Sequence, residues 1–309
     1  MEKNTEDVLE ETKGKIIFVN SFKGGAGKTT LSLSYCISAL FDALPWKNRE
    51  KYTNVIYMDL DILGTGTSYL FDDKYTKEKK YFNLTKNAVK IPLHLKDGVR
   101  KEFLYAAFLE PGLKNSSSYG EPHFINHQNI AQTTLKENVL SFIKQKFSEV
   151  PETLLVLDCA PGFSDFEQEI LLECYKMVKK DVLGVQEDYV TTLDHAHIHK
   201  CVQCLEDSVN GFKKLSSERT MNIIINDVQN YDGWLKDKTK AADEETKDAD
   251  EEWNRIKEEV LKQLEKADTR IWRWRYSENV AMSSVYLNGE KVENHPEDYL
   301  FTGEKFKEI

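Results

Sequence analysis

The sequence predicts an α/β protein with a mainly parallel sheet of seven or eight strands and helices on both faces. Near-continuous apolar runs of strand length occur at residues 16–19, 55–59, 154–158 and 221–226, and such runs are typical of strands buried on both faces. Longer segments with helical apolar spacing lie between them, and this alternation favours parallel strands joined by helices. Two of the runs end in Asp, so carboxylates gather at the carboxyl edge of the sheet, where ligands bind in such folds.

The remaining elements follow less regular patterns. Strands are expected at residues 103–108, 181–186 and 269–276, and helices at residues 31–44, 129–147, 166–179, 190–209 and 277–287. We expect a flexible lead at residues 1–13, one domain at residues 14–287 and a polar tail at residues 288–309. Within the domain, residues 72–102 are interpreted as an insertion and residues 236–252 as a charged surface segment.

Composition narrows the class of protein. At 309 residues the chain is long enough for one full α/β domain with insertions. It carries 42 Lys and Arg against 52 Asp and Glu, and the net charge of −10 argues against a protein that coats nucleic acid. Residues 241–252 hold seven acids and one lysine, a net −6, which leaves −4 for the rest. The five cysteines, the lack of a charged leader and the lack of an apolar stretch near 18 residues lead us to expect a cytoplasmic protein without a membrane anchor.

A glycine-rich turn follows the first strand. It reads Lys23-Gly24-Gly25-Ala26-Gly27-Lys28-Thr29-Thr30 and matches the core of the G-x-x-x-x-G-K-[ST] phosphate-loop pattern without its first glycine. Glycines let backbone N–H groups approach phosphate oxygens, and the N-terminus of the following helix adds unpaired N–H groups. Residues 24–30 are therefore candidates for binding nucleotide, with Lys28 on the β- and γ-phosphates and the Thr29 hydroxyl on Mg²⁺. A glycine turn that binds nothing is the alternative, which the Lys-Thr pair after the last glycine disfavours.

The early lysine of this turn gives a resemblance to a known family. The run from Lys23 to Thr30 resembles the deviant phosphate loop of the ParA/MinD family of P-loop ATPases, KGGxGKT[ST]. In that family the first lysine reaches across a dimer interface to the nucleotide of the partner subunit. The resemblance covers residues 14–287 and implies a homodimer across ATP, with Lys23 and Lys28 as catalytic residues. A solvated loop lysine is the alternative interpretation of Lys23.

Acidic residues at two strand ends extend the resemblance. Asp59-Leu60-Asp61 is similar to the D-x-D motif of the family, whose second Asp orients the attacking water, so Asp61 is the candidate for that role. The alternative is an acidic strand end that faces water. Asp158, followed by Cys-Ala-Pro-Gly, looks like the Walker B and switch II segment. The resemblance makes Asp158 a second organiser of Mg²⁺ and makes the backbone N–H of Gly162 a contact of the γ-phosphate.

Two further assignments concern the last strands. Family members use an Asn at the end of the sixth strand to read the adenine edge, so Asn226 is the expected base contact, against an ordinary turn Asn. Partition-type relatives bind DNA non-specifically through basic residues near the C-terminal part of the domain. Arg270, Arg273 and Arg275 are the matching candidates here, and the alternative is a buried strand whose arginines pair with acids.

The resemblance implies a Mg²⁺-ATP-dependent dimerising ATPase of the ParA type that acts as a partition or positioning switch. Its expected cofactors are ATP and Mg²⁺, and its expected partners are a second copy, non-specific DNA, or a protein that stimulates hydrolysis. Two alternatives stay open: a nucleotide-dependent regulatory scaffold, and a metabolic or metallocluster enzyme on the same fold. The pair Cys201 and Cys204 offers only two ligands per chain, within a predicted helix, so a metal cluster is disfavoured.

Overall fold

The architecture is taken from a computed structural model. It describes residues 14–46, 52–61, 88–94, 100–107, 128–162, 164–178, 183–192, 195–211, 219–226, 269–274, 299–301 and 306–308. The predicted lead at 1–13, the charged segment at 236–252 and the helix at 277–287 lie outside these residues. In the described part of the chain, no helix is long and apolar enough to cross a membrane.

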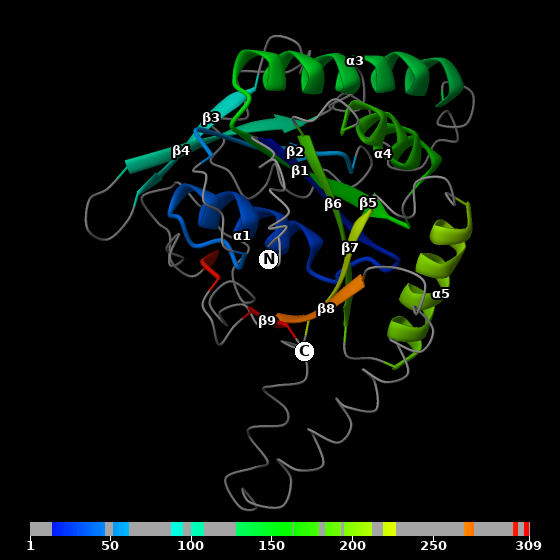
Figure 1. Ribbon diagram of the computed structural model, residues 1–309. Coiled ribbons are helices and arrows are strands. Elements are labelled where there is room, and N and C mark those ends of the chain that lie inside the picture. The colour runs from blue at the N-terminus through cyan, green and yellow to red at the C-terminus, as the bar shows by residue number, and fades with distance from the viewer. Residues whose placement is uncertain are drawn as a thin grey trace, which may run out of the picture.

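A single nine-stranded sheet forms the centre of the molecule, in the order β3-β4-β2-β5-β1-β6-β7-β8-β9 (Figure 1). The seven strands from β4 to β8 in this order pair in parallel, and β3 and β9 join antiparallel at the two edges. The strands are β1 (Gly14–Ser21), β2 (Asn54–Asp59), β3 (Val89–His94), β4 (Arg100–Ala107), β5 (Thr153–Pro161), β6 (Leu183–Thr192), β7 (Thr220–Asn226), β8 (Thr269–Trp274) and β9 (Phe306–Glu308).

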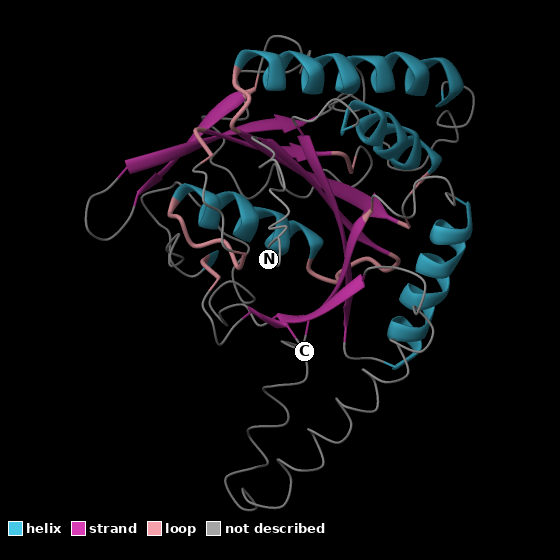
Figure 2. Cartoon of the chain, in the orientation of Figure 1, coloured by secondary structure: helices cyan, strands magenta, loops and turns pink. Residues whose placement is uncertain are grey.

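Helices cover both faces of this sheet, as the sequence predicts (Figure 2). The helix α1 (Lys28–Leu40) lies on one face, and α3 (Gln128–Glu149), α4 (Asp165–Val178) and α5 (His195–Gly211) lie on the other. Period-two alternation in β1 explains how one strand serves both layers. Ile17 and Val19 pack in the cluster that contains α1, whereas Ile16 and Phe18 pack in the cluster that contains α3 and α4. All four side chains have 0% exposure, so β1 is central to both cores.

The observed boundaries confirm most predicted strands and correct one pair of elements. The strand predicted at 181–186 continues to Thr192, and the helix predicted from residue 190 begins at His195 instead. The reason is sheet pairing, because Val190, Thr191 and Thr192 align with residues 224–226 of β7. Val and Thr are β-branched, and their stiff side chains suit a strand.

Both antiparallel edge strands lie where the sequence predicts no strand. The strand β3 lies within the segment interpreted as an insertion, and β9 lies within the segment interpreted as a tail. They raise the strand number to nine, above the expected seven or eight. In β3, Val89, Ile91 and Leu93 are buried in the cluster that contains α1 whereas Lys90 is exposed, so this edge strand lacks the continuous apolar run that marks the central strands.

Candidate nucleotide-binding site

The turn after β1 has the backbone conformation of a phosphate loop. Gly25 and Gly27 have positive φ angles of 76° and 100°, a region that favours glycine. Gly27 is the N-cap of α1, and its carbonyl accepts the first helical bond from Leu31 N at 2.9 Å. A Cβ at Gly27 would lie 2.7 Å from Asn226 Nδ2 and 3.2 Å from the Trp274 ring. Position 27 therefore requires glycine for two reasons: its φ angle is positive, and a Cβ would clash with Asn226.

Asn226 supports this loop from the end of β7. Its Nδ2 donates to the carbonyl oxygen of Ala26 at 2.8 Å, and the side chain is 1% exposed. The amide thereby ties the loop to a strand 200 residues away in sequence. The contact predicted between Asn226 and adenine stays a prediction, since the contact observed is with the loop that would hold phosphate.

Lys28, Thr29 and Asp158 meet beside the loop. The first turn of α1 carries Lys28 and Thr29, and the parallel register aligns Asp158 with Val19 on one side and Asp59 on the other. Thr29 Oγ1 donates to Asp158 Oδ2 at 2.6 Å. Lys28 is only 8% exposed, and its ammonium lies close enough to act on the Asp158 carboxylate. The three residues assigned to phosphate and metal thus lie together.

Tyr57 is a member of this site that the sequence did not identify. It lies in β2, and its hydroxyl donates to Asp158 Oδ2 at 2.6 Å. Asp158 is 2% exposed, and its second oxygen, Oδ1, has no hydrogen-bond partner among the described residues. Burial raises the pKa of Asp158, while the hydrogen bonds from Thr29 and Tyr57 and the charge of Lys28 act in the opposite direction.

The D-x-D segment lies next to this carboxylate. Asp59 is 3% exposed, and its Oδ1 accepts the backbone N–H of Asp61 at 2.9 Å. This local bond holds the turn at the end of β2. Asp61 is partly exposed, and its charge lies near enough to raise the pKa of Asp158; its role in orienting water stays a prediction.

The segment after β5 is fixed at both ends. The N–H of Gly162 donates to the Ser21 carbonyl at 2.8 Å, so this hydrogen bond would have to break before the N–H could contact a γ-phosphate.

Glu167 holds the other end of this segment. It accepts the backbone N–H of Ser164 at 2.6 Å and its hydroxyl at 2.8 Å, and it also accepts from the N–H of Ala160. Glu167 therefore caps the start of α4 by accepting the backbone N–H of Ser164, which is one half of a capping box.

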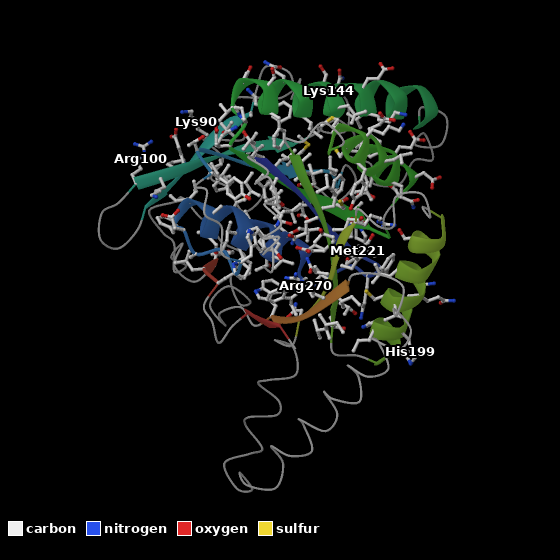
Figure 3. The ribbon with its side chains drawn as sticks, viewed as in Figure 1. Lys90, Arg100, Lys144, His199, Met221 and Arg270 are labelled. Atoms are coloured by element: carbon white, nitrogen blue, oxygen red, sulfur yellow. The ribbon has the colours of Figure 1, made fainter. Side chains whose placement is uncertain are left out.

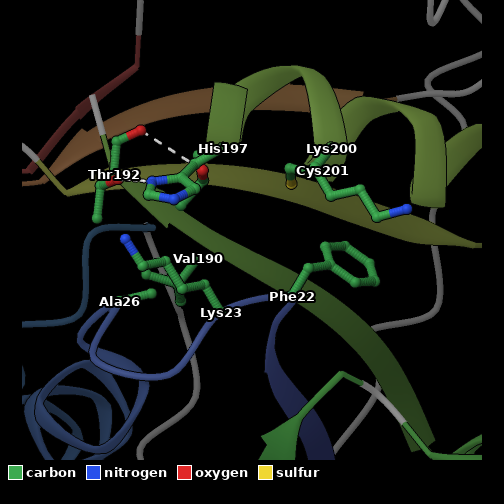
Figure 4. Close-up of a pocket in the computed structure, with 9 residues that line it drawn as sticks. Phe22, Lys23, Ala26, Val190, Thr192, His197, Lys200 and Cys201 are labelled. Carbon is green, nitrogen blue, oxygen red and sulfur yellow. Dashed lines mark hydrogen bonds between the residues drawn. The ribbon is translucent and has the colours of Figure 1, made fainter. Parts of the chain in front are cut away.

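Lys23 is exposed at the other side of the loop, over a pocket between the phosphate loop and α5 (Figure 4). The pocket is lined by Phe22, Lys23, Ala26, Val190, Thr191, Thr192, His197, Lys200 and Cys201. Phe22 stacks on Tyr189, with ring centroids 5.8 Å apart and planes within 9°. The exposure of Lys23 is compatible with a residue that reaches another subunit, and its predicted role across a dimer stays a prediction.

The arginine candidates are only partly within the described chain. Arg270 lies in β8 and is exposed, on the side of the sheet where α1 lies (Figure 3). Arg273 pairs in register with Ile225 of β7 and Lys307 of β9, and Arg275 lies outside the described residues. Trp274 is 1% exposed in the core, so β8 is anchored by its tryptophan. DNA binding through these arginines stays a prediction.

The donor set near Asp158 fits Mg²⁺ bound together with a nucleotide. Within the described ranges, no group of three or more His, Cys, Asp and Glu side chains forms a self-sufficient metal centre, and the five cysteines are free thiols. Mg²⁺ commonly takes one or two protein oxygens and completes its shell with water and phosphate. The Thr29 hydroxyl and the unpaired Oδ1 of buried Asp158 are oxygen ligands of this kind.

Known proteins show distant similarity to this chain. No family model matches the chain, and no curated protein matches its sequence. Among solved structures, pnob8 ParA is 12% identical with a TM-score of 0.46, covering 93% of this chain and 80% of that chain. A polypeptide of the MinC:MinD cell division protein complex of Aquifex aeolicus is 12% identical with a TM-score of 0.38, covering 69% of this chain and 68% of that chain. A plasmid partition protein from Borrelia burgdorferi is 17% identical with a TM-score of 0.33, covering 82% and 100%.

The strand order and the loop between β1 and α1 define an α/β P-loop NTPase fold. The mainly parallel sheet with helices on both faces confirms the fold class predicted from the sequence.

Proposed function

We propose that this chain is a Mg²⁺-ATP-dependent ATPase that dimerises across bound nucleotide and acts as a partition or positioning switch. The observation that carries the proposal is the junction of Thr29 with Asp158 directly beside a phosphate loop that contains buried Lys28. A glycine turn with a purely structural role has no use for a buried lysine next to a buried carboxylate with an unpaired oxygen, because both are costly to desolvate.

Each residue then has a role in hydrolysis of ATP to ADP and phosphate. Lys28 and the N–H groups of the loop bind and orient the phosphates, and Asp61 orients the attacking water. Thr29 and Asp158 would hold Mg²⁺, which would supply neutralising charge to the phosphates. Lys23 of one subunit acts on the nucleotide of the other. Bringing Gly162 to the γ-phosphate requires breaking its bond to Ser21, which would couple nucleotide state to the segment after β5.

Two lysines of the same loop provide the test, since one is buried and the other exposed. We expect Lys28→Ala to abolish binding of Mg²⁺-ATP in calorimetry, because the charge facing the phosphates is lost. Lys23→Ala is the matched control: it should bind nucleotide as a monomer but lose dimerisation or turnover, as measured by light scattering and phosphate release. An arginine finger contributes about 10³ to 10⁵ in rate, so even a partial equivalent is measurable. Wild-type affinity in Lys28→Ala would contradict the assignment of the phosphate loop.

Measurement of phosphate release also distinguishes the proposed switch from a regulatory scaffold, and it tests whether DNA or a protein is the partner. A scaffold would bind ATP and dimerise without turnover in the wild-type protein. Turnover measured with and without non-specific DNA at low salt tests the basic surface at Arg270, where any binding should weaken steeply with salt. Stimulation by DNA would support DNA as the partner, and its absence would favour a protein that stimulates hydrolysis.

A further inference from the structure

Asp158 presents its two oxygens to different surroundings. Oδ2 accepts two hydroxyl groups, from Thr29 and from Tyr57, each at 2.6 Å. Oδ1 is buried and has no hydrogen-bond partner among the described residues. Two short bonds on one oxygen fix the rotation of the carboxylate, because a turn of the group would break both of them. The orientation of Asp158 therefore depends on two donors rather than on Thr29 alone.

Tyr57 is itself held firmly. It is 0% exposed in β2, between β4 and β5, and aligns with Tyr105 on one side and Val156 on the other. Its ring stacks on that of Tyr105, with centroids 5.8 Å apart and planes 27° from parallel. A phenol packed in this way has little rotational freedom, so it delivers its hydroxyl to one place.

We propose that Tyr57 is a positioning residue of the metal–nucleotide site, whose hydroxyl commits Oδ2 of Asp158 to the protein and leaves Oδ1 for the metal. This inference rests on the proposed function, since it needs Mg²⁺ and nucleotide to bind beside Asp158. The ordinary alternative is that Asp158 merely satisfies a buried phenol. The two differ in what removal of the hydroxyl changes: metal affinity in one case, folding stability alone in the other.

The test uses Tyr57→Phe, which removes the hydroxyl and keeps the ring. Tyr105→Phe is the matched control, because it removes a hydroxyl from the stacked ring and leaves the bond between Tyr57 and Asp158 in place. Mn²⁺, a paramagnetic stand-in for Mg²⁺, is titrated into full-length ADP-loaded protein and followed by electron paramagnetic resonance. The affinity for ADP is measured separately in the absence of metal by calorimetry.

We expect Tyr57→Phe to weaken Mn²⁺ binding by about 10-fold or more, in the range that loss of a metal-site supporting group produces. Its affinity for metal-free ADP should match wild type, and Tyr105→Phe should match wild type in both measurements. A wild-type Mn²⁺ affinity in Tyr57→Phe would overturn the inference while leaving the proposed function intact. If the wild-type protein binds no Mn²⁺ beyond that held by free ADP, the proposed function fails first and the inference with it.

If Tyr57→Phe changes folding, thermal unfolding of the ligand-free protein reveals it. An equal loss of ADP and Mn²⁺ affinity together with a lowered midpoint would assign Tyr57 a structural role only, and would also overturn the inference. A selective loss of metal affinity at an unchanged midpoint supports positioning, since general loosening of the site would weaken both ligands.

Discussion

Glu187 and Asp158 are buried carboxylates that accept tyrosine hydroxyls, and they differ in whether the protein pairs both of their oxygens. Glu187 in β6 accepts from Tyr175 at 2.7 Å and from Tyr189 at 2.6 Å, and Arg219 donates to both of its oxygens at 2.7 Å. Asp158 also accepts from a buried phenol, but among the described residues no arginine donates to it and its Oδ1 has no hydrogen-bond partner.

The difference separates a structural carboxylate from one suited to a ligand. Each oxygen of Glu187 accepts one hydrogen bond from a tyrosine and one from Arg219, and the side chain is 0% exposed. A bidentate arginine pair of this kind fixes geometry and leaves no room for a cation. Asp158 instead retains a buried, unpaired oxygen next to the phosphate loop. Burial of an unsatisfied carboxylate oxygen is unfavourable, and a metal would relieve it.

The largest effect on stability is expected at the filled carboxylate. Arg219→Met leaves Glu187 buried without its counter-charge, and breaking such a pair typically costs about 3–5 kcal/mol. We expect the free energy of unfolding in urea to fall by this amount. The double variant Glu187→Gln/Arg219→Met should lose much less than the sum of the two single changes, since it removes both charges. A loss below about 1 kcal/mol in Arg219→Met would remove the contrast between the two sites.

At the open carboxylate we expect the reverse outcome, with function lost and stability kept. In Asp158→Asn the amide oxygen can still accept from Thr29 and Tyr57, and the NH₂ group replaces the oxygen that has no partner. The free energy of unfolding should change by less than about 1 kcal/mol. The affinity of ADP-loaded protein for Mn²⁺ should fall by about 10–100-fold. Marked destabilisation together with intact metal binding would show that Asp158 is a second structural carboxylate.

The smallest effect is a pH dependence of stability that Asp158 should contribute. Burial raises the pKa of Asp158 above its ordinary value of 3.8, so the folded state binds this proton more tightly than the unfolded state. Without metal, the free energy of unfolding of wild type should therefore rise relative to that of Asp158→Asn as the pH falls from neutrality through the pKa that Asp158 has in the folded protein. The difference between the two proteins should stop changing below pH 3.8. Each unit between the two pKa values contributes about 1.4 kcal/mol. Urea unfolding of both proteins from pH 7 to pH 4 measures the difference, and parallel curves would contradict this assignment.

Local patterns determined the sheet and its ligand edge. The runs at residues 16–19, 55–59, 154–158 and 221–226 became β1, β2, β5 and β7, since a strand buried on both faces has to be apolar almost throughout. The loop of residues 23–30 was recognisable because positive φ angles at Gly25 and Gly27 demand glycine. Sequence patterns were less informative for β3 and β9, which pair on one side only, and for the end of β6, where pairing with β7 decided the boundary.

By itself, the sequence determined the fold class, the glycine-rich loop after β1 and the carboxylates at the strand ends, because those features depend on residue type at short spacing. Only the tertiary structure decided what each carboxylate does. Tyr57 reads as one more apolar residue of its strand, yet its hydroxyl meets Asp158, 101 residues away. Glu187 and Arg219 are likewise joined across 32 residues. Whether a buried carboxylate oxygen has a hydrogen-bond donor depends on which strands lie next to each other in the sheet. Those strands are distant in sequence, so a local pattern does not predict the contact.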